Sequence, residues 1–167
     1  MRRKDREMGQ EFALMVLDKA EWMTLAMTGL DGAPYCIPIN MARQGEWLYL
    51  HSAPEGEKAQ CLRVHPKVCV TAVGDTHVIP ERYTTEFESA VVRGTAEELT
   101  ENQDRLEALR IFCAKYCGPQ QMGERFEKAA AGSFGRTALF RIHMDEITAK
   151  RKKYAADGTE LKYGAMG

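Results

Sequence analysis

The sequence lacks the features that mark several large classes of protein. It has no apolar run of eighteen residues, so no segment predicts a membrane-spanning helix. Its formal net charge is only -1 and both signs are interspersed, so we expect neither nucleic acid nor a membrane surface as a partner. The basic start, with Arg2, Arg3, Lys4 and Arg6, is not followed by the apolar region of a secretory signal. We therefore expect a cytoplasmic protein.

The five cysteines indicate neither a disulfide framework nor a metal centre. None forms a CxxC pair, none clusters with histidine at zinc spacing, and their number is odd. Cys113 and Cys117 are four residues apart on a predicted helix, but two thiols without further ligands make a poor metal site. We expect free thiols and no bound metal. The glycine-rich fingerprint of dinucleotide-binding folds is also missing.

The hydrophobic pattern predicts a mainly β protein with peripheral helices. With 167 residues and 44% hydrophobic composition, the chain can bury one core, so we expect one domain at residues 1–150 and a polar C-terminal tail at residues 151–167. Two-residue alternation predicts six antiparallel strands, at residues 22–27, 34–41, 46–51, 68–73, 84–96 and 137–147. Helical spacing predicts helices at residues 8–20, 57–64, 102–117 and 122–131, and the polar segment 74–83 predicts a loop. These elements describe one small barrel with attached helices.

The most informative segment for chemistry runs from His51 to Lys58. A strand end, a turn with glycine and a helix start place the Ser52 hydroxyl, the Lys58 ammonium and backbone N–H groups together, which suits phosphate binding. The alternative is a capped surface helix with a solvated lysine, and composition alone favours that alternative.

Several motifs follow one another in unbroken order between about residues 10 and 100. They are Tyr35-Cys36-Ile37-Pro38-Ile39-Asn40, then Leu50-His51-Ser52-Ala53 with Glu55, Gly56 and Lys58, then Val78-Ile79-Pro80-Glu81 with Tyr83-Thr84-Thr85, and Ser89-Ala90-Val91-Val92-Arg93-Gly94. In this order they resemble the 5-nitroimidazole resistance (Nim-type) proteins, which belong to the pyridoxamine 5'-phosphate oxidase-like FMN-binding split barrels.

The resemblance implies a six-stranded antiparallel split β-barrel that works as a homodimer, with FMN at the subunit interface. It places the flavin phosphate near His51, Ser52 and Lys58, and the partner subunit contributes from the 76–85 segment. The cofactor-binding residues that it implies are Pro38, Ile39, Asn40, His51, Ser52, Glu55, Gly56, Lys58, Tyr83 and Thr85. One departure is Glu57, which stands where the oxidase relatives place an arginine, so we do not expect pyridoxamine phosphate as the substrate.

His77 lies in the segment that resembles the substrate side of the Nim-type site, and we expect it to act there as a catalytic proton donor. The alternative is an exposed loop histidine without a role. The expected function is an FMN-dependent oxidoreductase that reduces small acceptors such as nitroimidazoles, with a nicotinamide or another reductant visiting transiently. A non-catalytic flavin- or haem-binding protein for storage or sensing is the alternative.

Overall fold

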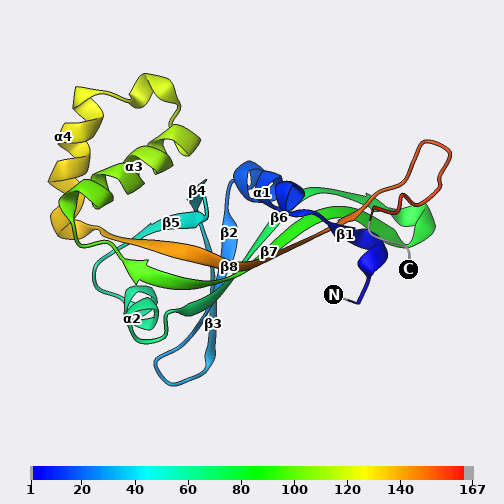
Figure 1. Cartoon of the computed structure of the whole chain (residues 1–167), viewed down its shortest axis with the longest axis horizontal. Helices are drawn as coiled ribbons and strands as arrows, with labels where there is room; N and C mark the ends of the chain where they lie inside the picture. The colour runs from blue at the N-terminus through cyan, green and yellow to red at the C-terminus, as the bar shows by residue number, and fades with distance from the viewer. Residues whose placement is uncertain (1, 164–167) are drawn as a thin grey trace.

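Residues 2–163, which the computed structural model describes, fold into one antiparallel sheet of eight strands with helices around it (Figure 1). The strands are β1 (Glu7–Met8), β2 (Met23–Thr28), β3 (Pro34–Ile39), β4 (Ala42–Gln44), β5 (Trp47–Ser52), β6 (Lys67–Ile79), β7 (Thr84–Glu98) and β8 (Ala138–Lys152). The α-helices are α1 (Gln10–Lys19), α2 (Glu57–Val64), α3 (Asn102–Tyr116) and α4 (Glu124–Ser133). Short 3-10 turns are η1 (Lys4–Arg6), η2 (Pro80–Arg82), η3 (Pro119–Gln121) and η4 (Phe134–Arg136).

The sheet has the form of a barrel that is left open along one side. Its strand order is β3-β2-β6-β7-β8-β5-β4, with β1 added on β8, and the end strands β3 and β4 do not pair with each other. The predicted class, mainly β with peripheral helices and a split barrel, is confirmed. The predicted number of six strands is wrong because β1 and β4 have only two and three residues, too few to produce a readable alternation.

Strands β6 and β7 form a long hairpin, whose outer part leaves the barrel as an arm at the right of Figure 1. The predicted loop at residues 74–83 is wrong, since β6 continues to Ile79 and pairs with β7 up to Ile79↔Thr84. A register shift between Val73 and Thr76 interrupts the pairing. Beyond it most β6 side chains are exposed, so no alternation between buried and exposed positions marks this part of the strand.

The last strand is also longer than predicted. β8 ends at Lys152, so the expected boundary at residue 150 cuts through a strand. The following residues fold back instead of forming a loose tail: Tyr154 bridges Glu160, and the Tyr163 amide donates to the Asp5 carbonyl at 3.1 Å. Residues 164–167 of the predicted tail lie outside the described residues.

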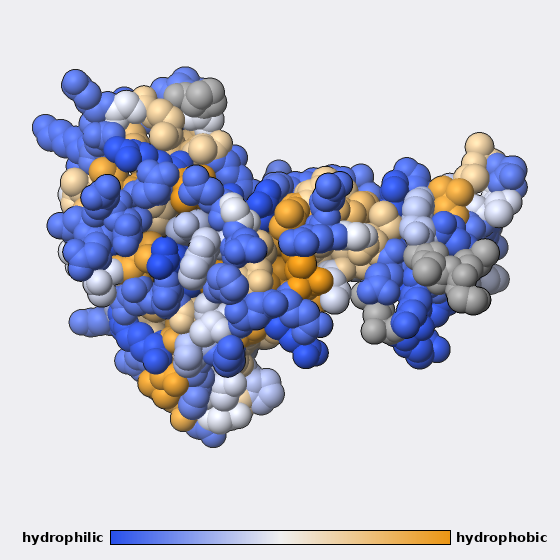
Figure 2. All heavy atoms as spheres, viewed as in Figure 1, coloured by the Kyte–Doolittle hydropathy of each residue, from blue (hydrophilic) through white to orange (hydrophobic). Residues whose placement is uncertain are grey.

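The core lies on the inner face of the barrel. Met23, Leu25 and Met27 are at most 5% exposed, as their alternation predicts. Helix α1 packs Val16 and Leu17 into this core, and α2 adds further buried side chains at one barrel end, Ala59, Cys61 and Leu62. Hydrophilic groups cover most of the visible surface, and hydrophobic atoms gather at the waist between barrel and arm (Figure 2). None of the described helices is long and apolar enough to cross a bilayer.

Candidate functional site

The turn between β5 and α2 builds a cradle of hydrogen-bond donors. Strand β5 ends at Ser52, and α2 begins after Gly56, whose φ of 136° favours glycine. Gly56 is the N-cap residue and offers no side chain to the first turn of α2. The N–H groups at this helix start are therefore available to a ligand, and the helix dipole favours an anion there.

Lys58 brings an uncompensated positive charge to the cradle. Its side chain is half-buried, and burial lowers the pKa of the ammonium below its usual value. Its Nζ atom is 3.5 Å from the His51 carbonyl oxygen, and no carboxylate of residues 2–163 lies within ion-pair distance of it. Arg63, on the same helix, is instead neutralised by Glu98 at 2.6 Å. Lys58 is thus the cation of α2 that an external anion can pair with.

His51 lies beside Lys58 at the end of β5. Its ring meets the Phe112 ring edge-on, with the centroids 5.0 Å apart. Burial, and then the charge of Lys58, lower the pKa of the imidazole. Both effects favour the uncharged ring, which offers a hydrogen bond to a ligand rather than a charge.

The strand that carries Pro38 and Ile39 is an edge strand. Among residues 2–163, β3 pairs only with β2, so its other edge carries backbone groups without a strand partner there. Pro38 and Asn40 are exposed and Ile39 is half-buried. The Asn40 amide donates from Nδ2 to the Glu21 carbonyl at 2.7 Å, which fixes the end of this segment. An open edge beside half-buried apolar groups is a suitable surface for a flat ring with a polar rim.

Two residues that the sequence did not reveal hold the corner after β3. Lys115 and Tyr116, at the end of α3, both donate hydrogen bonds to the Met41 carbonyl, at 2.9 and 2.8 Å. They are 74 and 75 residues away from Met41 along the chain, and no motif or periodicity links them to it.

The remaining predicted residues are not brought to the cradle within one chain. His77 lies in β6 opposite Glu86, so the loop predicted for it is wrong, and it is exposed. Thr85 is exposed in β7, opposite Val78. Tyr83, at the tip, is 98% exposed and has a φ of 50°. All of them belong to the arm, which extends away from α2 in Figure 1.

Glu55 sits in the turn before α2 and is exposed. Glu57 opens the helix as an acidic residue of its first turn and is also exposed. No group of three or more potential metal ligands occurs among residues 2–163, and all five cysteines are free.

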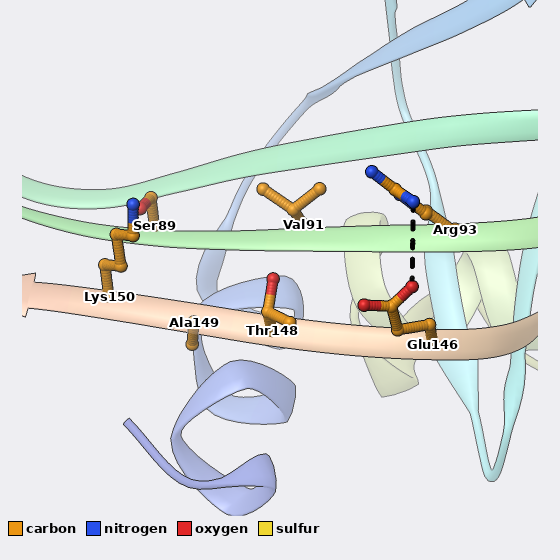
Figure 3. A pocket seen from close by; sticks show the side chains of 7 residues that line it. All are labelled: Ser89, Val91, Arg93, Glu146, Thr148, Ala149 and Lys150. Carbon is orange, nitrogen blue, oxygen red and sulfur yellow. Dashed lines mark ion pairs between the residues drawn. The ribbon is translucent and has the colours of Figure 1, made fainter. Parts of the chain in front are cut away.

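The outer face of β7 and β8 carries a groove of about 350 Å³. Its side chains rise from both strands, as Figure 3 shows for Ser89, Val91, Arg93, Glu146, Thr148 and Lys150. Arg93 and Glu146 are 3.9 Å apart, and their side chains are 74% and 60% exposed. Such an exposed ion pair is weak, so either charge can change partners at little cost.

Comparisons with known proteins agree with this architecture. The sequence profile of the family described as pyridoxamine 5'-phosphate oxidase matches residues 10–151. No curated protein sequence matches. Among solved structures, a candidate 5-nitroimidazole antibiotic resistance protein from Bacteroides thetaiotaomicron is 24% identical, with a TM-score of 0.73 and coverage of 87% of this chain and 86% of that one.

Two further structures share the fold. A conserved hypothetical protein from Mycobacterium tuberculosis is 18% identical, with a TM-score of 0.77 over 89% of this chain and 88% of that one. A FAD and haem binding protein from Mycobacterium smegmatis is 19% identical, with a TM-score of 0.71 over 96% and 87%. Because the family profile spans most of the sequence, the chain belongs to the pyridoxamine 5'-phosphate oxidase family of split barrels.

Proposed function

We propose that this chain is an FMN-dependent oxidoreductase that works as a homodimer and reduces small, flat acceptors such as nitroimidazoles. The observation that carries the proposal is the half-buried Lys58 ammonium at the uncapped start of α2, which has no carboxylate partner among residues 2–163. Family membership supports a flavin as the ligand. Similar folds named for FAD binding and for nitroimidazole resistance support the redox role and the acceptor class.

The cradle and β3 suit the two ends of FMN. The phosphate would accept hydrogen bonds from Lys58, Ser52 and the first N–H groups of α2. The ring would lie along residues 38–40, where the open edge of β3 offers backbone donors and acceptors. The exposed carboxylate of Glu57 lies in the same helix turn and opposes a second anionic group, which disfavours a phosphorylated substrate beside the cofactor.

A second copy of the chain would cover the apolar arm and complete the flavin site. The arm exposes large apolar side chains: Val73 is 59% exposed, Val78 is 64% exposed and Tyr83 is 98% exposed. Exposed apolar groups of this kind are typical of an interaction surface. In the homodimer that we propose, this arm lies over the partner's cradle and brings His77, Tyr83 and Thr85 toward the flavin.

Bound FMN would supply the electron transfer to the acceptor. The chain's own groups would bind and orient the flavin, exclude water and donate the proton. Lys58 and α2 bind the phosphate, β3 orients the ring, and the partner's arm excludes water from the reacting side. The His77 imidazole would donate a proton to the acceptor as the acceptor gains electrons.

Replacing His77 by alanine tests the catalytic role. We expect the purified variant to keep its full complement of FMN, because His77 lies on the arm and not in the cradle. After anaerobic reduction with dithionite, its reoxidation by a 5-nitroimidazole should be about a hundredfold slower than in the wild type, since a proton donor is lost. Stopped-flow absorbance of the flavin measures this rate. Equal rates would show that His77 is a bystander, and a wild type that binds FMN but is not reoxidised would favour the non-catalytic alternative.

A charge exchange tests whether the outer groove belongs to the proposed dimer interface. In a two-fold interface the same face occurs twice, so Arg93 of one chain can pair with Glu146 of the partner subunit. We expect Arg93→Glu to weaken dimerisation at least about tenfold, and the double exchange R93E/E146R to restore it. Sedimentation equilibrium at several concentrations gives the dissociation constants. A single variant that dimerises like the wild type would remove this groove from the interface.

A further inference from the structure

We propose that Lys115 and Tyr116 are positioning residues that set the place of the flavin-binding strand β3. The proposal rests on the proposed function, because it assigns to residues 38–40 the contact with the flavin ring. Neither residue belongs to the cradle, and both act through the backbone of Met41.

The contacts converge on one carbonyl group. Tyr116 Oη donates to the Met41 oxygen at 2.8 Å, and Lys115 Nζ donates to the same oxygen at 2.9 Å and to the Leu17 carbonyl at 3.1 Å. Met41 is fully buried and directly follows Asn40. Helix α3 thereby joins the end of α1 and the corner between β3 and β4 at a single point.

Partial burial of the Lys115 ammonium costs free energy, which indicates that this side chain has a specific role. The ammonium is half-buried, and burial is the main reason why its pKa is lowered. Asp18 attracts the ammonium and Arg43 repels it, and these two groups pair with each other at 2.5 Å. In the described part of the chain the ammonium has only the two carbonyls as hydrogen-bond partners. A half-buried charge that has no ion-pair partner among residues 2–163 stabilises a fold poorly compared with an apolar side chain of the same size. The ammonium instead fixes local geometry, because two carbonyl groups must point at one nitrogen atom.

The contacts at Met41 also restrict Asn40, the residue before it. Its Nδ2 atom binds the Glu21 carbonyl at 2.7 Å. Burial raises the pKa of the Tyr116 phenol, and the neighbouring Asn40 side chain offsets part of that rise. Asn40 is thus tied to the segment between α1 and β2, and its side chain lies beside Tyr116 of α3. Without these bonds, the last residues of an edge strand would lose their fixed place, and hydrogen bonds to a ring edge depend on placement within about 0.5 Å.

Two variants that keep the side-chain volume test the clamp formed by Lys115 and Tyr116. Lys115→Met removes the ammonium, and Tyr116→Phe removes only the hydroxyl; Lys128→Met, on the exposed face of α4, is the matched control. Hydrogen exchange of the flavin-free protein, followed by mass spectrometry, should be about tenfold faster in peptides covering residues 39–43 for both variants, and unchanged for the control.

The second readout is the visible circular dichroism of bound flavin, together with the dissociation constant for FMN. We expect altered flavin bands and about tenfold weaker binding in both clamp variants. Faster exchange with wild-type flavin bands would overturn the positioning role, and so would unchanged exchange. If the wild type binds no FMN, the proposed function fails, whereas the exchange data alone then support or overturn the clamp.

Discussion

Replacing Gly94 by alanine is expected to lower the free energy of unfolding by about 3 kcal/mol, the upper end of the usual cost of overpacking a core. Gly94 is buried in β7 at the register shift opposite β8. A Cβ atom at this position would lie 2.6 Å from Ile142 Cγ2 and even closer to the His143 carbonyl oxygen. Both atoms belong to a central strand, so neither can yield cheaply.

The Gly94→Ala substitution should disturb the outer face of β7 and β8 as well as the core. The register shift at Gly94 leaves Asp145 without a backbone pairing partner on β7, although its carboxylate accepts a hydrogen bond from Thr95. The shift also sets the positions of Arg93 and Glu146 in the groove. If Gly94→Ala still folds, we therefore expect it to dimerise more weakly than the wild type.

Gly132→Ala is the matched control. Gly132 is exposed in α4, and a Cβ atom there would meet nothing within 4 Å. Because alanine favours the helix, this variant should gain about 0.5 kcal/mol. Urea unfolding followed by far-ultraviolet circular dichroism gives both values. Equal stability of Gly94→Ala and the wild type would contradict the tight strand contact.

Replacing Lys58 by alanine should weaken FMN binding by about 2 kcal/mol, or roughly thirtyfold. The loss is large because the ammonium is half-buried and no carboxylate in the described part of the chain pairs with it, so its bond to a phosphate is shielded from water. Burial lowers the pKa of Lys58 in the absence of an anion; a bound phosphate would raise it again and keep the ammonium charged at neutral pH.

Quenching of FMN fluorescence on titration with flavin-free protein measures this affinity. Lys128→Ala removes an exposed lysine from α4 and should leave the affinity unchanged. In the wild type the affinity should fall with rising salt, and the slope should be smaller for Lys58→Ala, because one charge contact is missing. An unchanged affinity in Lys58→Ala would place the phosphate elsewhere.

Local sequence signals predicted the elements that are local in the structure. The helix predicted at residues 57–64 has those bounds in α2, because Gly56 and Pro66 flank a short run with helical spacing. The cradle was predictable for the same reason: His51, Ser52 and Lys58 lie within eight residues of one another, so a strand end and a helix start suffice to bring them together.

Elements that depend on distant contacts were not predictable. The outer half of β6 has both faces exposed and lacks an alternating pattern, so only its pairing with β7 makes it a strand. The contacts of Lys115 and Tyr116 with Met41 depend on how α3 packs across the sheet, which no periodicity within α3 encodes. Family resemblance placed His77 in the 76–85 segment, but its strand conformation follows from the same pairing.

In the complex that we propose, a cradle at the end of β5 holds FMN and a second copy of the chain closes it. Size-exclusion chromatography of the wild type mixed with excess FMN, with absorbance and light scattering recorded across the eluted peak, tests both parts together. We predict a yellow peak at twice 18.8 kDa with one flavin per chain. A colourless peak at 18.8 kDa would contradict the account.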